Sequence, residues 1–180
     1  MKTTTFALLC LLMILGTNLS AQKRGSAGGY GNTLNLGLGI GGYSGYYGYV
    51  GRSLPVFNIN YEFDVAKNFT LAPFITFYSY RNNKYYYRET VIPIGVKGSY
   101  YFDDAFDAGS DWDFYLAGSL GFSIVNTRWD NYDRDYYDGY RKVDPLFLDL
   151  HVGAEYHLSS KVGLFLDLST GVSTLGLSFR

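Results

Sequence analysis

Apolar and polar residues alternate with a period of two along most of this 180-residue sequence, and this alternation limits the fold more than any other feature. In the segment 34–40, leucine or isoleucine occupies every second position, and asparagine or glycine occupies the positions between. Successive side chains of a strand point to opposite faces of a sheet, so the pattern predicts half-buried strands rather than helices. The alternation recurs in eight segments: 34–40, 57–63, 71–77, 92–102, 112–124, 146–158, 164–168 and 175–179.

Short and long connections alternate between these segments. On one side of the predicted strands, 64–68 and 159–161 are short and 103–111 is longer and acidic. On the other side, 43–53, 81–88 and 127–142 are longer and rich in tyrosine, and only the last hairpin, near Gly171, breaks the pattern because it is tight. Short turns on one side and longer loops on the other are typical of a membrane barrel whose termini face the periplasm. The sequence therefore predicts an all-β fold, an eight-stranded antiparallel up-and-down transmembrane β-barrel.

Composition agrees with strands and excludes some functions. The chain has 19 tyrosines and 22 glycines, a combination that weakens helices but suits strands with one apolar face. Its formal charge of −1 provides no basic excess to neutralise phosphates, so we predict no nucleic-acid partner. No segment after the N-terminus is a long apolar run, which excludes a helical membrane protein but not a barrel.

The N-terminus has the features of an export signal. Lys2 precedes the apolar run 6–15, which is too short to span a bilayer, and Ala21 offers a small residue for cleavage. We predict a signal peptide at 1–21, a flexible periplasmic lead-in at 22–32 and one barrel domain at 33–180. The only cysteine, Cys10, lies in the signal, so the exported chain must be stable without disulfides.

The two faces of the predicted strands differ in size and charge. One face carries leucine, isoleucine, valine and aromatic residues, while the other carries mostly glycine, serine, asparagine and threonine. An eight-stranded barrel has a narrow interior, so the small face fits the lumen and the apolar face points to lipid. The charged residues on the small face predict a lumen network that fills the barrel, without an open pore: Glu62, Lys97, Asp149, Glu155 and Asp167, together with Arg180.

An exported soluble barrel or two-sheet sandwich remains an alternative, because it could bury the same apolar face and bind an apolar ligand. Such a protein would have an apolar interior and would be found in the periplasm or the medium.

At this point the sequence resembles the small porin-like outer-membrane β-barrels of the OmpX or OmpA-barrel type. The resemblance rests on the alternating strands, on 153–158 before a turn, and on the C-terminal segment 174–180. Thr174, Gly176 and Phe179 match the family's assembly signal, whose final aromatic residue is missing after Arg180. The resemblance implies residence in the outer membrane, contact with its lipid and lipopolysaccharide, recognition by the assembly machinery, and a monomer.

The connection 127–142 has the composition of an adaptable binding surface, because tyrosine supplies contact area at small entropic cost. We predict a possible extracellular binding loop there, formed by Trp129, Tyr132, Arg134, Tyr136, Tyr137 and Tyr140. The same tyrosines could instead form the outer aromatic girdle of the barrel, and the two interpretations are compatible.

Catalytic and metal motifs are weak. His157 and Ser159, with Glu155, resemble the site of lipid A deacylases, but they fall at a predicted periplasmic turn, far from a substrate in the outer leaflet. The aspartates between 103 and 113 lack the order of a calcium loop. We therefore predict a non-enzymatic structural or surface-interaction protein without cofactor or metal, and keep a lipid A-modifying barrel enzyme as a second alternative.

Overall fold

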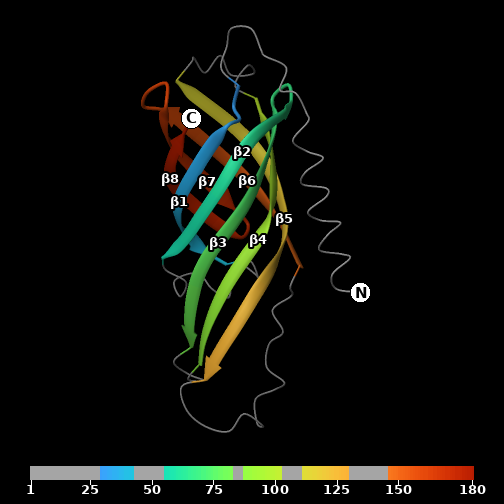
Figure 1. Ribbon diagram of the computed structural model, residues 1–180, viewed down its shortest axis with the longest axis vertical. Coiled ribbons are helices and arrows are strands. Elements are labelled where there is room, and N and C mark those ends of the chain that lie inside the picture. The colour runs from blue at the N-terminus through green and yellow to red at the C-terminus, as the bar shows by residue number, and fades with distance from the viewer. Residues whose placement is uncertain (1–28, 43–54, 83–86, 103–110, 130–145) are drawn as a thin grey trace.

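The computed structural model describes residues 29–42, 55–82, 87–102, 111–129 and 146–180. Within them the chain forms eight strands, each hydrogen-bonded to the next, and β8 pairs with β1 to close a barrel (Figure 1). The strands are β1 (Thr33–Gly41), β2 (Val56–Ala66), β3 (Phe69–Asn82), β4 (Tyr87–Tyr101), β5 (Trp112–Trp129), β6 (Leu146–His157), β7 (Val162–Ser169) and β8 (Val172–Phe179). Every pair is antiparallel, so the predicted eight-stranded up-and-down barrel is confirmed. Among the described residues there is no apolar helix of the length that a membrane span requires.

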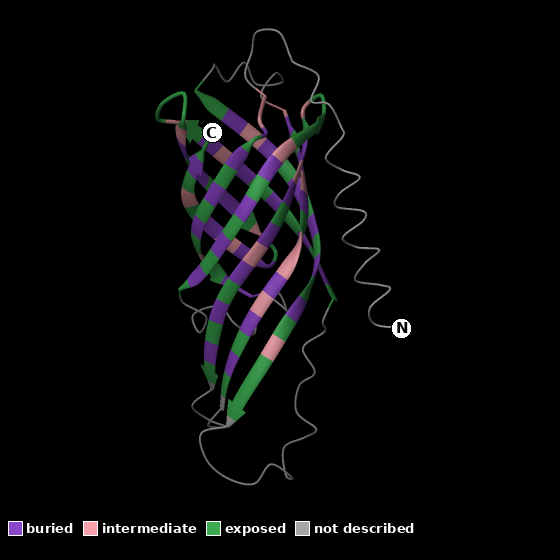
Figure 2. Cartoon of the chain, in the orientation of Figure 1, coloured by how far each residue is buried: buried purple, intermediate pink, exposed green. Residues whose placement is uncertain are grey.

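The alternation in the sequence becomes an alternation in burial. Buried and exposed residues follow one another along each strand in Figure 2, and β6 shows the regular pattern from Leu146 onward. The buried positions point into the lumen, and the exposed ones form the outer wall of the barrel. The apolar residues occupy the outer wall, as the size of the two faces predicted.

Strands β3, β4 and β5 extend beyond the others at the end opposite the C-terminus of β8, the lower end in Figure 1. The predicted loop 81–88 is shorter than expected, because β3 continues to Asn82 and β4 begins at Tyr87. The predicted loop 127–142 likewise begins later, since β5 continues to Trp129. The strands stay paired in this region although their sequences no longer alternate between apolar and polar residues. The alternation ends because these residues lie beyond the apolar part of the wall. Because the sequence predicts that the termini face the periplasm, we call this end the outer end and the opposite one the periplasmic end.

Two positions at strand ends have unusual backbone angles. Asn68, between β2 and β3, has a φ of 58°, a left-handed conformation that asparagine tolerates better than most residues. Gly41, at the end of β1, has a φ of 113° and lies against the backbone of Gly171, where a side chain would clash. The lack of a side chain at Gly41 therefore allows the end of β1 to approach the hairpin between β7 and β8 closely.

Large aromatic side chains in the lumen lie over glycines on the neighbouring strand. A Cβ atom on any of these glycines would collide with the ring beside it, so each glycine makes room for one aromatic side chain. The pairs are Phe74 with Gly95, Phe147 with Gly121, Phe165 with Gly176, and Tyr115 with Gly153. This pairing explains how a narrow lumen holds both a high glycine content and several aromatic rings.

Candidate functional site: the wall and the lumen

The outer wall is apolar on every strand. Leu146, Leu148 and Leu150 on β6 are 67%, 72% and 64% exposed, and comparable residues occupy the outward positions of the other strands. Such a continuous band is far larger than the apolar patches that soluble monomers expose to water. The wall therefore requires an apolar environment around the barrel.

Aromatic residues form a girdle at the periplasmic end of this wall. Its exposed members come from six strands: Tyr61, Phe69, Tyr100, Trp112, Tyr156 and Phe179. The rings of Trp112 and Tyr156 lie 4.9 Å apart on the adjacent strands β5 and β6. Aromatic side chains of this kind gather where a bilayer meets water. The girdle therefore marks one boundary of the apolar band.

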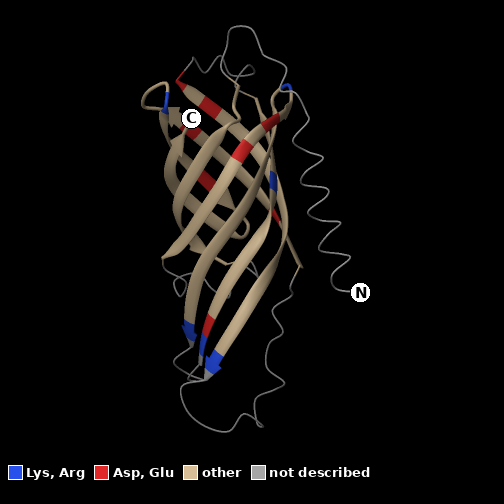
Figure 3. Ribbon diagram, in the orientation of Figure 1, with Lys and Arg blue, Asp and Glu red and all other residues tan. Residues whose placement is uncertain are grey.

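All six residues of the predicted lumen network lie on the inward face or at its periplasmic end, but the structure places them in four separate groups. Lys97 contacts Asp167, and Arg180 contacts Glu155. Glu62 accepts hydrogen bonds from neutral side chains, and Asp149 accepts one from the Thr170 hydroxyl at 3.1 Å. Figure 3 shows that most acidic positions of the barrel lie in its half nearer the C-terminus.

Lys97 and Asp167 form the central ion pair. The Lys97 ammonium lies 2.9 Å from Asp167 Oδ2, and both side chains are buried. Tyr115 donates its hydroxyl to the same oxygen at 2.8 Å, and its ring lies 5.0 Å from the Lys97 nitrogen. These contacts join β4, β5 and β7 across the lumen. A buried pair satisfied in this way holds strands in one arrangement, because leaving either charge alone would be costly.

Asp167 also anchors a hydrogen-bonded series with the geometry of a Ser-His-Asp triad. His151 Nδ1 lies 2.7 Å from Asp167 Oδ1, and His151 Nε2 lies 3.0 Å from the Ser119 hydroxyl. Ser119 is 2% exposed, and the adjoining cavity has a volume of about 20 Å³. A space of that size holds about one water molecule, so no ester or amide can reach the hydroxyl. The geometry supports a structural network in the lumen rather than hydrolysis.

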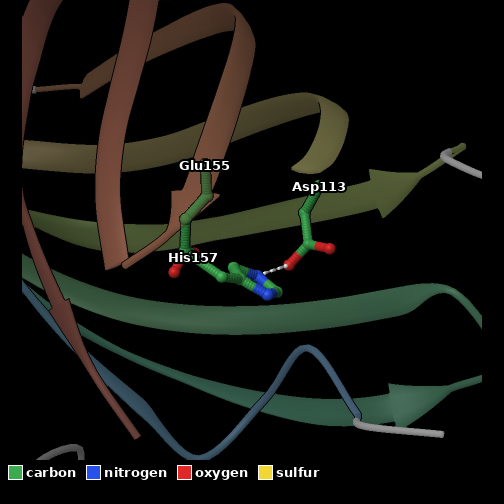
Figure 4. Close-up of side chains that lie close together, drawn as sticks. All are labelled: Asp113, Glu155 and His157. Atoms are coloured by element: carbon green, nitrogen blue, oxygen red, sulfur yellow. Dashed lines mark hydrogen bonds and ion pairs between the residues drawn. The ribbon is translucent and has the colours of Figure 1, made fainter. Parts of the chain in front are cut away.

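A second charged cluster closes the periplasmic end. Arg180 lies 2.8 Å from Glu155 and 3.1 Å from Asp113, while His157 Nε2 lies 2.7 Å from the same Asp113 oxygen. Figure 4 shows Asp113, Glu155 and His157 directed toward one another from β5 and β6. These three side chains could together supply metal ligands. Arg180 already contributes the positive charge that a metal ion would bring, so the cluster is accounted for as an ion-pair network.

Glu62 begins a ladder of polar side chains along the lumen. It accepts hydrogen bonds from Tyr101 at 2.7 Å and from the Thr70 hydroxyl, and Asn35 donates to it at 3.3 Å. The amides of Asn35, Asn60 and Asn58 continue the series, which ends where Asn58 donates to Thr76 at 2.7 Å. Neutral amides therefore connect β1, β2 and β3 and lead from the charged half of the lumen toward its outer half.

The outer half of the lumen is filled by apolar side chains instead. This apolar plug consists of Val56, Phe74, Tyr78, Val91, Phe147 and Val172, all less than 9% exposed. The rings of Phe74 and Phe147 lie 6.2 Å apart. Two of these residues, Phe74 and Val172, also line the small cavity beside Ser119, so the plug borders that cavity on the outer side.

The remaining predicted site residues lie largely outside the described residues. Tyr132, Arg134, Tyr136, Tyr137 and Tyr140 belong to that part, as do 1–28, which include the predicted signal. Trp129 is the last residue of β5 rather than part of a loop. At the end of the predicted lead-in, Tyr30 stacks on Tyr101 with ring centroids 3.9 Å apart.

The deacylase-like pair is not formed. Ser159 accepts hydrogen bonds from the backbone of Lys161 and Val162 and so stabilises its own turn, while His157 is directed to Asp113. Asp113 is not among the predicted lumen residues, although it belongs to the predicted strand segment 112–124, and it is buried in the lumen. Its position on the inward face agrees with the alternation along β5, because Asp113 has the same parity as Tyr115 and Ser119.

No protein-family model matches this sequence, and no curated protein sequence matches it either. Among solved structures, the chain is similar to Neisserial surface protein A, with 12% identity, a TM-score of 0.55, and coverage of 82% of this chain and 94% of that one. A designed transmembrane β-barrel also matches, with 13% identity, a TM-score of 0.46, and coverage of 85% and 98%. So does the outer-membrane protein Ail of Yersinia pestis, with 8% identity, a TM-score of 0.45, and coverage of 83% and 99%. The resemblance in fold to the small eight-stranded outer-membrane barrels is thereby confirmed.

Proposed function

We propose that this protein is a resident barrel of the bacterial outer membrane with a structural or surface-interaction role, not a pore or an enzyme. The observation that carries the proposal is the inversion of polarity: apolar residues form the outer wall, and charged residues are buried in the lumen. Lipid is the environment in which such an arrangement is favourable. The likeness in fold to Neisserial surface protein A supports the same environment.

The alternatives predicted from sequence have less support. A soluble barrel that binds an apolar ligand needs an apolar interior cavity, whereas the cavity here is lined by Lys97, His151 and Asp167 among others. A lipid-modifying enzyme needs a nucleophile that its substrate can reach, but Ser119 is enclosed and Ser159 serves its turn. A pore needs a continuous opening, and the apolar plug fills the outer half of the lumen.

With the lumen filled, the outer end of the barrel is the part that can contact other molecules. There β3, β4 and β5 extend beyond the rest of the wall. Their outward residues there are polar or charged, and they lie next to the predicted binding loop 127–142. A raised three-stranded sheet gives such a surface a rigid support, which favours recognition of a partner outside the cell or of the membrane surface itself.

Substitution of Leu148 by arginine tests the facing of the wall. Leu148 is 72% exposed and lies within the apolar band, so a charge there costs about 2–4 kcal/mol and should strongly reduce the amount of assembled protein in outer-membrane fractions. Leu158→Arg is the matched control, because Leu158 is 58% exposed but lies at the turn after β6. Normal membrane levels of Leu148→Arg would contradict the proposal.

A further inference from the structure

The outward faces of β3, β4 and β5 change character in three steps toward the outer end. Their successive rows are apolar (Phe77, Ile92 and Ile124), then neutral polar (Ser79, Thr90 and Asn126), then cationic (Arg81, Arg88 and Arg128). The register makes the last two rows true rows, since each residue is paired directly with its neighbour on the next strand. The arginines are therefore side by side on one face of the wall.

Three arginines in one cross-strand row are unfavourable on their own. Adjacent strands are about 4.8 Å apart, and like charges directly opposite each other destabilise a sheet. Within the part of the chain that the structure describes, no carboxylate forms an ion pair with Arg88 or Arg128. Glu89, the neighbour of Arg88 in the sequence, is buried on the opposite face of β4. Arg81 also interacts within the protein, so it is Arg88 and Arg128 above all that are placed to receive an anion from outside the barrel.

The distance of the arginine row from the apolar band indicates the class of anion that the row can bind. Each step of two residues advances about 6.7 Å along a strand, so the arginines lie about 13 Å along the strands beyond the last apolar row. At a strand tilt of about 40° this is about 10 Å along the membrane normal, just beyond the hydrocarbon. Figure 3 shows basic positions at the lower ends of the three extended strands. The row continues the lipid-facing wall, so a lipid headgroup reaches it more directly than a ligand bound over the barrel mouth.

We propose that Arg81, Arg88 and Arg128 bind the phosphate groups of an anionic lipid in the outer leaflet. Guanidinium groups bind phosphate oxygens through paired, charge-assisted hydrogen bonds, and several arginines in a row match a headgroup with more than one phosphate. Ser79, Thr90 and Asn126 lie between this row and the apolar band, where their polar groups can contact the sugar or glycerol part of the headgroup. The inference rests on the proposed function, because it requires the wall to stand in a membrane.

The test compares thermal unfolding of the full barrel in two kinds of vesicle. One is pure phosphatidylcholine, and the other is phosphatidylcholine with a minor fraction of lipid A that carries two phosphates. The variant is Arg88→Gln/Arg128→Gln. The matched control is Lys67→Gln/Lys161→Gln, which removes the same charge from exposed residues at the periplasmic turns. Lipid A without phosphates and inorganic phosphate in neutral vesicles are the two further arms.

Lipid A with phosphates should raise the unfolding temperature of the wild type and of the control variant. In the arginine variant the rise should fall by more than half. In neutral vesicles the arginine variant should be as stable as the wild type or more so, because repulsion within the row is relieved. A merely damaged fold would lower the unfolding temperature of the arginine variant in both kinds of vesicle. A variant that is less stable than the wild type only in vesicles with lipid A would therefore indicate a lost lipid contact.

Equal rises in the arginine variant and the wild type would overturn the assignment. So would an equal rise with phosphate-free lipid A, since phosphate would then not be the ligand. An equal rise with inorganic phosphate alone would show an anion site that needs no lipid, and would also overturn it. Failure of the wild type to fold into neutral vesicles would overturn the membrane barrel itself, and would thus be distinguished from failure of the arginine site alone.

Discussion

The two halves of the lumen are filled by different chemistry. The half toward the chain termini contains two ion-pair clusters, centred on Lys97 with Asp167 and on Arg180 with Glu155, while the opposite half contains the apolar plug around Phe74 and Phe147. Charges that are paired across strands fix which strands face each other, but they also attract water. The plug excludes water without specifying partners. The comparison suggests that the polar half determines the arrangement of strands and the apolar half closes the barrel.

Breaking the polar half should have the largest effect. In Lys97→Met the Asp167 carboxylate loses its ion pair, and the loss should lower the free energy of unfolding by about 3–5 kcal/mol. Urea unfolding of the barrel folded into vesicles measures this quantity. The double variant Lys97→Met/Asp167→Asn should recover part of the loss, because no uncompensated charge remains. A double variant as unstable as the single one would contradict the importance of the pair.

Breaking the apolar half should cost somewhat less. Phe147→Ala leaves a cavity beside Gly121, and we expect a loss of roughly 3 kcal/mol, because the Phe74 ring 6.2 Å away can relax into part of the space. Phe122→Ala is the matched control, since Phe122 is 50% exposed and faces the outside at nearly the same height. If Phe147→Ala and Phe122→Ala lowered the free energy of unfolding equally, the apolar plug would contribute no more to stability than the outer wall does, and the role given to the outer half would be wrong.

The smallest effect is expected where the halves meet. Asn58 donates to Thr76 at 2.7 Å and accepts from Asn60 at 3.1 Å, and both bonds are buried. Asn58→Ala should therefore lower the free energy of unfolding by about 1 kcal/mol. The exposed Asn126→Ala should change it by less than about 0.5 kcal/mol. A loss at Asn58 as large as that at Lys97 would mean that the amide ladder, rather than the ion pair, holds the strands together.

The sequence was sufficient for the architecture because period-two alternation carries it. Leu146, Leu148 and Leu150 indicated both a strand and its lipid-facing side, and the narrow interior of an eight-stranded barrel decided which face pointed inward. The inward position of Glu62, Lys97 and Asp167 followed from the same parity. These predictions needed only local spacing and the volume of the lumen.

The partners of these residues could not be predicted, because they depend on register between strands. Lys97 and Asp167 are 70 residues apart, and only the closed barrel brings them together. The arginine row has the same origin: Arg81 and Arg88 appeared to belong to a loop, and Arg128 to another. The triad-like series at Ser119 and the stacking of Tyr30 on Tyr101 likewise join strands or segments that no motif relates.

Heat-modifiable gel migration of outer-membrane fractions tests the central claim, that the apolar wall of this barrel stands in lipid. Folded membrane barrels resist detergent until they are heated, so the account predicts that boiled and unboiled samples migrate differently and that the shifting band is confined to the outer-membrane fraction. The same migration in both samples, with the protein recovered in the soluble fraction, would contradict the account and return the apolar face to the interior.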